Sequence, residues 1–158
     1  MIILGIDPGY ERLGIAIVEK NPQEKERLVY SECFKTLAKN EHALRLRQIG
    51  ERLDEIIKKY KPDTMAIETL FFETNAKTVM KVSEARGVCI YVAKSNDLKI
   101  REFTPLQIKV AVTSYGKSDK KQVIFMVEKL VKIDKKIQHD DEYDAIAGAL
   151  TAIASNVR

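Results

Sequence analysis

Apolar residues along the chain fall either into short continuous runs or at helical spacing, which predicts an α/β protein. Short runs bounded by turn residues or charges are typical of strands. Longer stretches with apolar residues three and four positions apart are typical of helices packed on one face. Strands are expected at 2–6, 13–19, 27–35, 64–68 and 98–103, and helices at 41–60, 75–94, 105–113, 119–129 and 141–154.

The order of these elements predicts one domain, residues 1–158, built on a five-stranded mixed sheet flanked by helices. Short turns join the first three strands, so these are expected to form an antiparallel meander. The fourth strand follows a helix and is expected to lie parallel to a strand already in the sheet. If that neighbour is the first strand, Asp7 and Glu68 lie at the carboxyl ends of adjacent parallel strands. Ligand sites of open α/β sheets tend to lie at this edge.

Two further carboxylates, Asp141 and Asp144, open the last helix three residues apart and therefore share one helix face. Simpler roles are open for each group: Asp7 could cap the turn at Pro8, and acidic residues suit any helix N-terminus. Together, four like charges at one point would repel strongly without a counter-charge. Oxygen ligands of this kind suit Mg²⁺ or Mn²⁺ rather than zinc. Two such ions, about 4 Å apart, can activate water and stabilise the leaving oxygen of a phosphodiester.

Histidine and cysteine offer no competing site. His42 falls on the polar side of its helix and is expected to be solvated, while His139 adjoins the acidic pair and could assist water or phosphate. The two cysteines, Cys33 and Cys89, show neither a disulfide framework nor metal-thiolate spacing, which favours a reducing cytosol.

Composition is compatible with a nucleic-acid partner without being diagnostic of one. Hydrophobic residues make up 45% and charged residues 32% of the chain, with a net charge of +4 and a pI of about 9.0. The apolar start is too short for a signal peptide, and no apolar stretch approaches membrane-spanning length. A cytoplasmic protein without membrane association is therefore expected.

Four motifs give the sequence a specific resemblance. They are Gly-Ile-Asp-Pro-Gly at 5–9, Ala-Ile-Glu-Thr-Leu-Phe-Phe at 66–72, Glu-Ala-Arg-Gly-Val at 84–88 and Asp-x-x-Asp-Ala at 141–145. In this order and over nearly the whole chain, the sequence resembles the RuvC family, bacterial Holliday junction resolvases of the ribonuclease H-like superfamily. The resemblance implies a homodimeric, Mg²⁺-dependent endonuclease that cuts two opposed strands of a four-way DNA junction in recombination and repair. It also implies partnership with the RuvA and RuvB branch-migration complex.

The resemblance implies roles for particular residues. Asp7, Glu68, Asp141 and Asp144 fall on the catalytic, metal-binding carboxylates of the family, with two Mg²⁺ per subunit that Mn²⁺ could replace. The Asp140-Asp141 repeat leaves the register ambiguous by one residue, and the three-residue spacing to Asp144 selects Asp141.

DNA contacts are expected from an aromatic residue and several lysines. Phe71 falls where the family has an aromatic that stacks on a junction base, and Lys109 and Lys120 fall on its basic residues near the DNA. Lys117 and Lys121 cluster with Lys120 near one loop. Phosphate contacts by such lysines make affinity fall with salt. Core packing is the alternative for Phe71, and a solvated helix surface is the alternative for each lysine.

Three other functions deserve comparison. The sequence Asp7-Pro8-Gly9 loosely matches the phosphate loop of sugar-kinase or actin-like ATPases, but those need two such domains and this chain is about half that length. A non-catalytic nucleic-acid-binding relative would be expected to lack a carboxylate. A different nuclease of the superfamily, such as one that cuts an RNA strand, is disfavoured by the aromatic pair after Glu68 and by Gly87. Gly87 is expected at a close helix contact, either within the subunit or between subunits.

Overall fold

The elements follow the expected order, and the computed structural model describes residues 1–70 and 76–155. The strands are β1 (Ile2–Asp7), β2 (Arg12–Glu19), β3 (Glu26–Lys35), β4 (Thr64–Glu68), β5 (Lys99–Phe103) and β6 (Val131–Lys132). The helices are α1 (His42–Tyr60), α2 (Ala76–Ser95), α3 (Pro105–Thr113), α4 (Lys120–Leu130) and α5 (Asp140–Ser155). Every element that the sequence predicts is present, with ends within one residue of expectation.

The strands form a mixed sheet in the order β5-β4-β1-β2-β3-β6. β1, β2 and β3 make the antiparallel meander, and β4 lies parallel to β1, as expected. The described chain has six strands rather than five, because Val131 and Lys132 pair in parallel with the start of β3. Two residues at the end of a helix carry no periodic signal, so this strand could not be recognised from the sequence.

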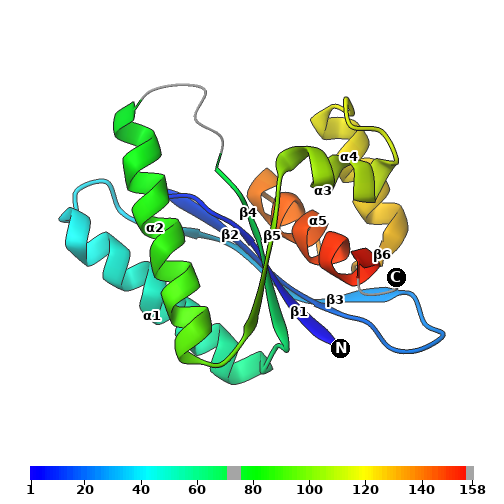
Figure 1. Ribbon diagram of the computed structural model, residues 1–158, viewed down its shortest axis with the longest axis horizontal. Helices are drawn as coiled ribbons and strands as arrows, with labels where there is room; N and C mark the ends of the chain where they lie inside the picture. The colour runs from blue at the N-terminus through cyan, green and yellow to red at the C-terminus, as the bar shows by residue number, and fades with distance from the viewer. Residues whose placement is uncertain (71–75, 156–158) are drawn as a thin grey trace.

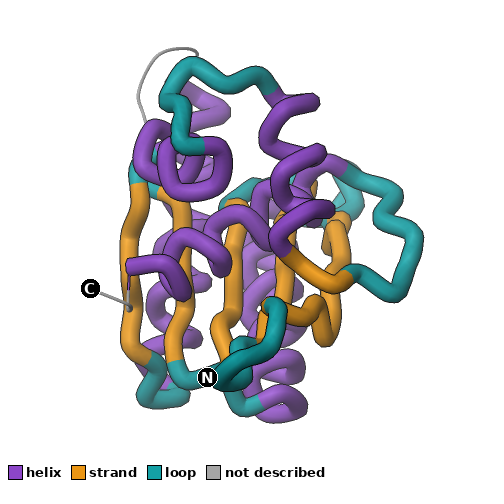
Figure 2. Tube along the Cα trace, turned by 90° about the vertical axis from the view of Figure 1, so that its right-hand side faces the viewer, coloured by secondary structure: helices purple, strands orange, loops and turns teal. Residues whose placement is uncertain are grey.

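Helices cover both faces of the sheet. Figure 1 shows α1 and α2 on one side and α3, α4 and α5 on the other, and Figure 2 shows the strands running side by side between them. Side chains of β1 alternate between the two cores: Ile3 packs with the α5 side and Leu4 with the α1–α2 side. β1 is therefore buried on both faces, as its continuous apolar run indicates.

Two glycines allow α5 to lie directly on the central strands. A Cβ atom at Gly5 of β1 would overlap the carbonyl of Ala145, and one at Gly14 of β2 would overlap the carbonyl of Asp141. Any other residue at either position would push the helix away from the sheet. These contacts fix both the height and the register of the first turns of α5 above the ends of β1 and β2.

The structure qualifies two expectations about single residues. A Cβ at Gly87 would meet no described atom within 4 Å, so the expected close contact is not made within the subunit, and a contact between subunits stays a prediction. His42 is not simply solvated: its ring nitrogens lie 3.0 Å from the Tyr10 hydroxyl and 2.5 Å from a carboxylate oxygen of Glu84. The histidine thus links the turn after β1 to α2, because partners from other elements converge on what the sequence shows as a polar helix face.

Candidate active site and nucleic-acid interface

Three of the four predicted carboxylates, Asp7, Glu68 and Asp144, line one cavity of about 320 Å³ at the carboxyl edge of the sheet. Lys109 from α3 and Lys120 from α4 line the same cavity. The residues come from five elements, so the site exists only when the whole fold is assembled. The strand order and the helix spacing predict this meeting for four carboxylates, and Asp141 is the one that does not line the cavity.

Strand register and the glycine contacts explain how the carboxylates meet. In the sheet, Ile6 pairs with Ile67, so Asp7 and Glu68 follow as neighbours at the ends of parallel strands. On the other side of β1, Asp7 pairs with Gly14, and the carbonyl of Asp141 lies against Gly14. Asp144 follows one helical turn later and faces the cavity.

The site destabilises ionised carboxylates. Burial is the largest cause that raises the pKa of Asp7 to about 7, followed by repulsion from Asp144, Glu68 and Asp141. Burial and the charge of Asp144 likewise raise the pKa of Glu68 to about 7. The pKa of Asp144 is also raised by burial, although the ion pair with Lys120 opposes this change. Like charges crowded in a low-dielectric cleft favour proton or cation binding.

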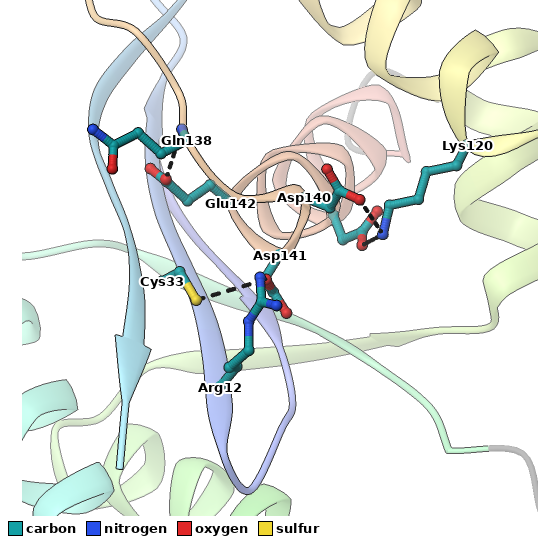
Figure 3. Close-up of polar contacts among 8 residues, drawn as sticks. Arg12, Cys33, Lys120, Gln138, Asp140, Asp141 and Glu142 are labelled. Atoms are coloured by element: carbon teal, nitrogen blue, oxygen red, sulfur yellow. Dashed lines mark hydrogen bonds and ion pairs between the residues drawn. The ribbon is translucent and has the colours of Figure 1, made fainter. Parts of the chain in front are cut away.

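Cationic side chains pair with several of the acidic groups. The Lys120 ammonium lies 3.1 Å from Asp144 and 3.4 Å from Asp140, and the Arg12 guanidinium pairs with Asp141. Figure 3 shows Arg12 and Cys33 on one flank of the first turn of α5 and Lys120 on the other. Asp141 is therefore oriented toward Arg12 rather than into the cavity that the other three carboxylates line.

The donor set fits a hard divalent cation, but the described side chains do not form a complete cage. Among residues 1–70 and 76–155, no three His, Cys, Asp or Glu side chains are grouped so that they could hold a metal ion. The cavity nevertheless supplies carboxylate oxygens from Asp7, Glu68 and Asp144, with raised pKa values for all three. Oxygen donors of this type match Mg²⁺ or Mn²⁺. Binding would require the Lys120 contact to Asp144 to open.

The residues predicted to contact DNA lie on different surfaces of the structure. Lys109 and Lys120 line the carboxylate cavity, and Lys117 is exposed in the loop before α4. Lys121 points instead into a separate hollow beside Tyr115 on the far side of α4. Phe71 lies outside the described residues. Consecutive residues at a helix start diverge by about 100°, which explains why Lys120 and Lys121 face different ways.

Two residues near the site were missed by sequence reasoning. Arg12 is three residues past Gly9, and nothing in its local sequence shows that the hairpin carries it to Asp141. Arg86 of α2 donates from Nε to the backbone carbonyl of Glu68 at 3.0 Å and pairs with Glu102 of β5. Its side chain is 16% exposed and fixes the end of β4. The Glu-Ala-Arg-Gly-Val motif was the available signal for Arg86.

Comparison with known proteins gives consistent matches along the chain. A family profile described as crossover junction endodeoxyribonuclease RuvC matches residues 3–152. Proteins of that name from Alkaliphilus metalliredigens and Desulforamulus reducens are 46% and 41% identical over 150 residues, each alignment covering 95% of this chain and 91% of the relative.

Solved structures also match over nearly the whole of this chain. Thermus thermophilus RuvC in complex with a Holliday junction substrate superposes with a TM-score of 0.92 at 28% sequence identity, covering 99% of this chain and 94% of that one. The yeast mitochondrial Holliday junction resolvase Ydc2 shares the fold, with a TM-score of 0.73 at 14% identity over 98% of this chain and 78% of its own. In the described residues, no helix is long and apolar enough to span a membrane.

Proposed function

The chain belongs to the RuvC family of crossover junction endodeoxyribonucleases, whose members are metal-dependent nucleases, and from this premise we propose its action in detail. It is a Holliday junction resolvase that nicks two symmetric strands of a four-way DNA junction by phosphodiester hydrolysis, in homologous recombination and DNA repair. The observation that carries the proposal is the meeting of Asp7, Glu68 and Asp144 in one cavity beside two lysines.

We propose that Asp7, Glu68, Asp141 and Asp144 are the catalytic carboxylates and hold two Mg²⁺ ions, which Mn²⁺ can replace. When bound, such a pair of ions supplies an activated water and stabilises the leaving oxygen. The protein's own contribution is positional. β1 and β4 present Asp7 and Glu68 from a rigid edge, and α5 brings Asp144 against them. Asp141 joins the set when the Arg12 guanidinium is drawn away, since that ion pair is what turns its carboxylate aside.

Lys109 and Lys120 are placed to act on the DNA rather than on the carboxylates alone. Their ammonium groups favour ionisation of Glu68 and border the cavity in which it lies. A phosphate entering that cavity would offer Lys120 a second anionic partner in place of Asp144. Lys117 is exposed in the loop before α4, and Lys121 lines the hollow beside Tyr115, so we assign both to DNA contacts outside the carboxylate cavity. Phe71, three positions after Glu68, is proposed to stack on a junction base, a contact worth roughly 1–3 kcal/mol.

A homodimer accounts for two symmetric cuts, because a two-fold axis presents one site to each of two equivalent strands. The surface best suited to form it is one stripe of α2. Met80 and Tyr91 are 65% and 73% exposed, and Gly87 lies between them with open space above its Cα. Apolar side chains beside a glycine permit a second helix to approach closely. We further propose cooperation with the RuvA and RuvB complex, in the cytoplasm, on the basis of family membership.

One gel assay tests the proposed function. Synthetic four-way junction and linear duplex of the same arm sequence are incubated with the protein, in Mg²⁺ or in chelator. Paired nicks in opposed strands of the junction are expected in Mg²⁺, with the duplex intact and no product in chelator. Cutting of duplex and junction at equal rates, or cutting in chelator, would contradict the proposal.

A further inference from the structure

A further hollow, of about 410 Å³, lies between β3 and the start of α5. We call it the β3 hollow. Its walls come from β3 and from the segment that leads into α5, and its lining residues include Cys33, Lys35, Lys135, Lys136, His139 and Glu142. None of these residues lines the carboxylate cavity.

The β3 hollow adjoins the active site through Asp141. The Cys33 sulfur lies 3.6 Å from a carboxylate oxygen of Asp141, the same oxygen that Arg12 contacts. Figure 3 shows Cys33 and Lys120 on opposite sides of the first turn of α5, so the β3 hollow, which Cys33 lines, and Lys120 flank the turn that carries Asp141. A nucleic-acid strand that crosses the carboxylates therefore meets a lysine cluster in one direction and this hollow in the other.

The anionic groups of the hollow are already neutralised, which leaves its lysines in excess. Glu142 is 4% exposed and accepts hydrogen bonds from Lys135 at 2.7 Å and from the Ser31 hydroxyl at 2.6 Å. Glu32 pairs with Arg52 of α1 at 2.7 Å. Lys35 and Lys136 are exposed and have no ion-pair partner among the described residues.

Lys135 orders the hollow as well as neutralising it. Its ammonium also donates to the backbone carbonyl of Ser31 at 2.7 Å, so it ties the segment before α5 to the middle of β3. Lys136, the next residue, lines the same hollow as Lys35, and the Lys135 contact fixes the backbone beside it. Two cations on an ordered concave surface lose less entropy on binding an anion than two flexible surface lysines.

We propose that the β3 hollow binds backbone phosphates of the substrate strand on the side of the cut opposite Lys109 and Lys120, through Lys35 and Lys136. This rests on the proposed function, because it takes the carboxylate cavity as the place of cutting. The charge pattern requires contacts on both sides. The acidic centre repels the strand that it cuts, so flanking cations must hold the strand in register.

The test measures junction binding in chelator, so that no strand is cut, over a range of salt concentrations. The variant is Lys35→Gln with Lys136→Gln. Its control is Lys94→Gln with Lys99→Gln, two exposed lysines where α2 ends and β5 begins, at the opposite edge of the sheet. Each lost phosphate contact is expected to flatten the plot of log affinity against log salt by about 0.9, so the hollow variant should lose about 1.8 per subunit. The control should match the wild type.

Modified junctions locate the contact. Methylphosphonates replace the phosphates on one side of the cut position and then on the other. On the hollow side, neutral linkages should weaken binding by the wild type but not further weaken binding by the hollow variant. On the other side, both proteins should lose affinity equally.

The outcomes separate the two proposals. A wild type that binds and cuts junctions while the hollow variant keeps the full salt slope would overturn the inference about the hollow alone. A wild type that neither binds nor cuts a junction would overturn the proposed function. Unchanged thermal unfolding of both double variants is the expected sign that the exposed substitutions leave the fold intact.

Discussion

Buried carboxylates on either side of the start of α5 behave in opposite ways. Burial raises the pKa of Asp7 to about 7, where the nearby groups are mostly other carboxylates. Burial alone would also raise the pKa of Glu142, but hydrogen bonds from Lys135 and Ser31 lower it below its ordinary value. The comparison teaches that burial by itself does not mark a functional acid. A buried carboxylate with its own donors stabilises the fold, whereas one that faces like charges awaits a cation from outside.

The largest expected effect is on catalysis. Asp7→Asn should reduce the rate of junction cleavage at least about 10³-fold, because it removes a metal-binding oxygen at the centre of the cavity. Junction binding in chelator should survive, since loss of a negative charge does not weaken phosphate contacts. Single-turnover cleavage and a binding titration measure the two effects separately. Nicking at close to the wild-type rate would rule out the assignment of Asp7.

Substitution of Glu142, the carboxylate with its own hydrogen-bond donors, should mainly lower the stability of the fold. Glu142→Ala leaves the Ser31 hydroxyl and the Lys135 ammonium without their acceptor, and should lower the free energy of unfolding by about 2–3 kcal/mol. Urea unfolding at pH 7 measures it. The control is Glu51→Ala, which removes the exposed Arg47–Glu51 pair of α1 and should cost less than about 0.5 kcal/mol. Similar losses in both variants would show that the Glu142 network contributes no more than a surface pair.

The pH dependence sharpens the contrast. Asp7 has an ordinary pKa of 3.8 and a folded-state pKa of about 7, so the folded protein binds more protons than the unfolded chain between these values. Its contribution therefore makes the metal-free protein less stable as pH rises from 4 to 7, by about 1–3 kcal/mol. Glu142, with a lowered pKa, contributes stability that is lost as pH falls.

The free energy of unfolding of the metal-free protein and of Asp7→Asn, measured between pH 4 and 8, tests the direction of this change. The variant should be the more stable of the two at pH 8 and should lose the advantage near pH 4. In the wild type, Mg²⁺ should raise the unfolding temperature more at pH 8 than at pH 5. A wild type that is more stable than the variant at pH 8 without metal would contradict the electrostatic account.

The smallest effect is expected from substitution of Arg86, which holds the backbone of Glu68 in place. Arg86→Met removes the donor to the Glu68 carbonyl and the pair with Glu102, and should raise the Mg²⁺ concentration for half-maximal thermal stabilisation by about threefold to tenfold. Arg86→Lys should recover part of this, because an ammonium can reach one partner but not both. Arg52→Met, which disrupts the α1–β3 pairing with Glu32, is the control and should leave the Mg²⁺ requirement unchanged.

The sequence was sufficient for the five longer strands and for the helices, and it predicted the meeting of Asp7, Glu68 and Asp144 at one edge of the sheet, because each gives a strong local signal. Apolar runs that end in Asp7 and Glu68 identify both the strands and their functional ends. The capping boxes at α3 and α4, Thr104 with Gln107 and Asp119 with Gln122, agree with the expected starts of these helices within one residue.

Long-range pairings could not be read in the same way. The pairings of Arg12 with Asp141, His42 with Tyr10 and Glu142 with Ser31 join residues between 32 and 129 positions apart, and each depends on the geometry of the assembled sheet. The β3 hollow is a case of the same kind. Lys35 and Lys136 look like ordinary surface lysines until β3 and the approach to α5 are placed side by side.

The contact of α5 with Gly5 and Gly14 has a consequence for the spacing of the carboxylates. With main chain seated on main chain, the separation between helix and sheet cannot be adjusted by exchanging core side chains. The spacing of Asp144 from Asp7 is therefore set by the backbone, and a substitution at Gly5 or Gly14 should alter this spacing more than an exchange of core side chains under α5.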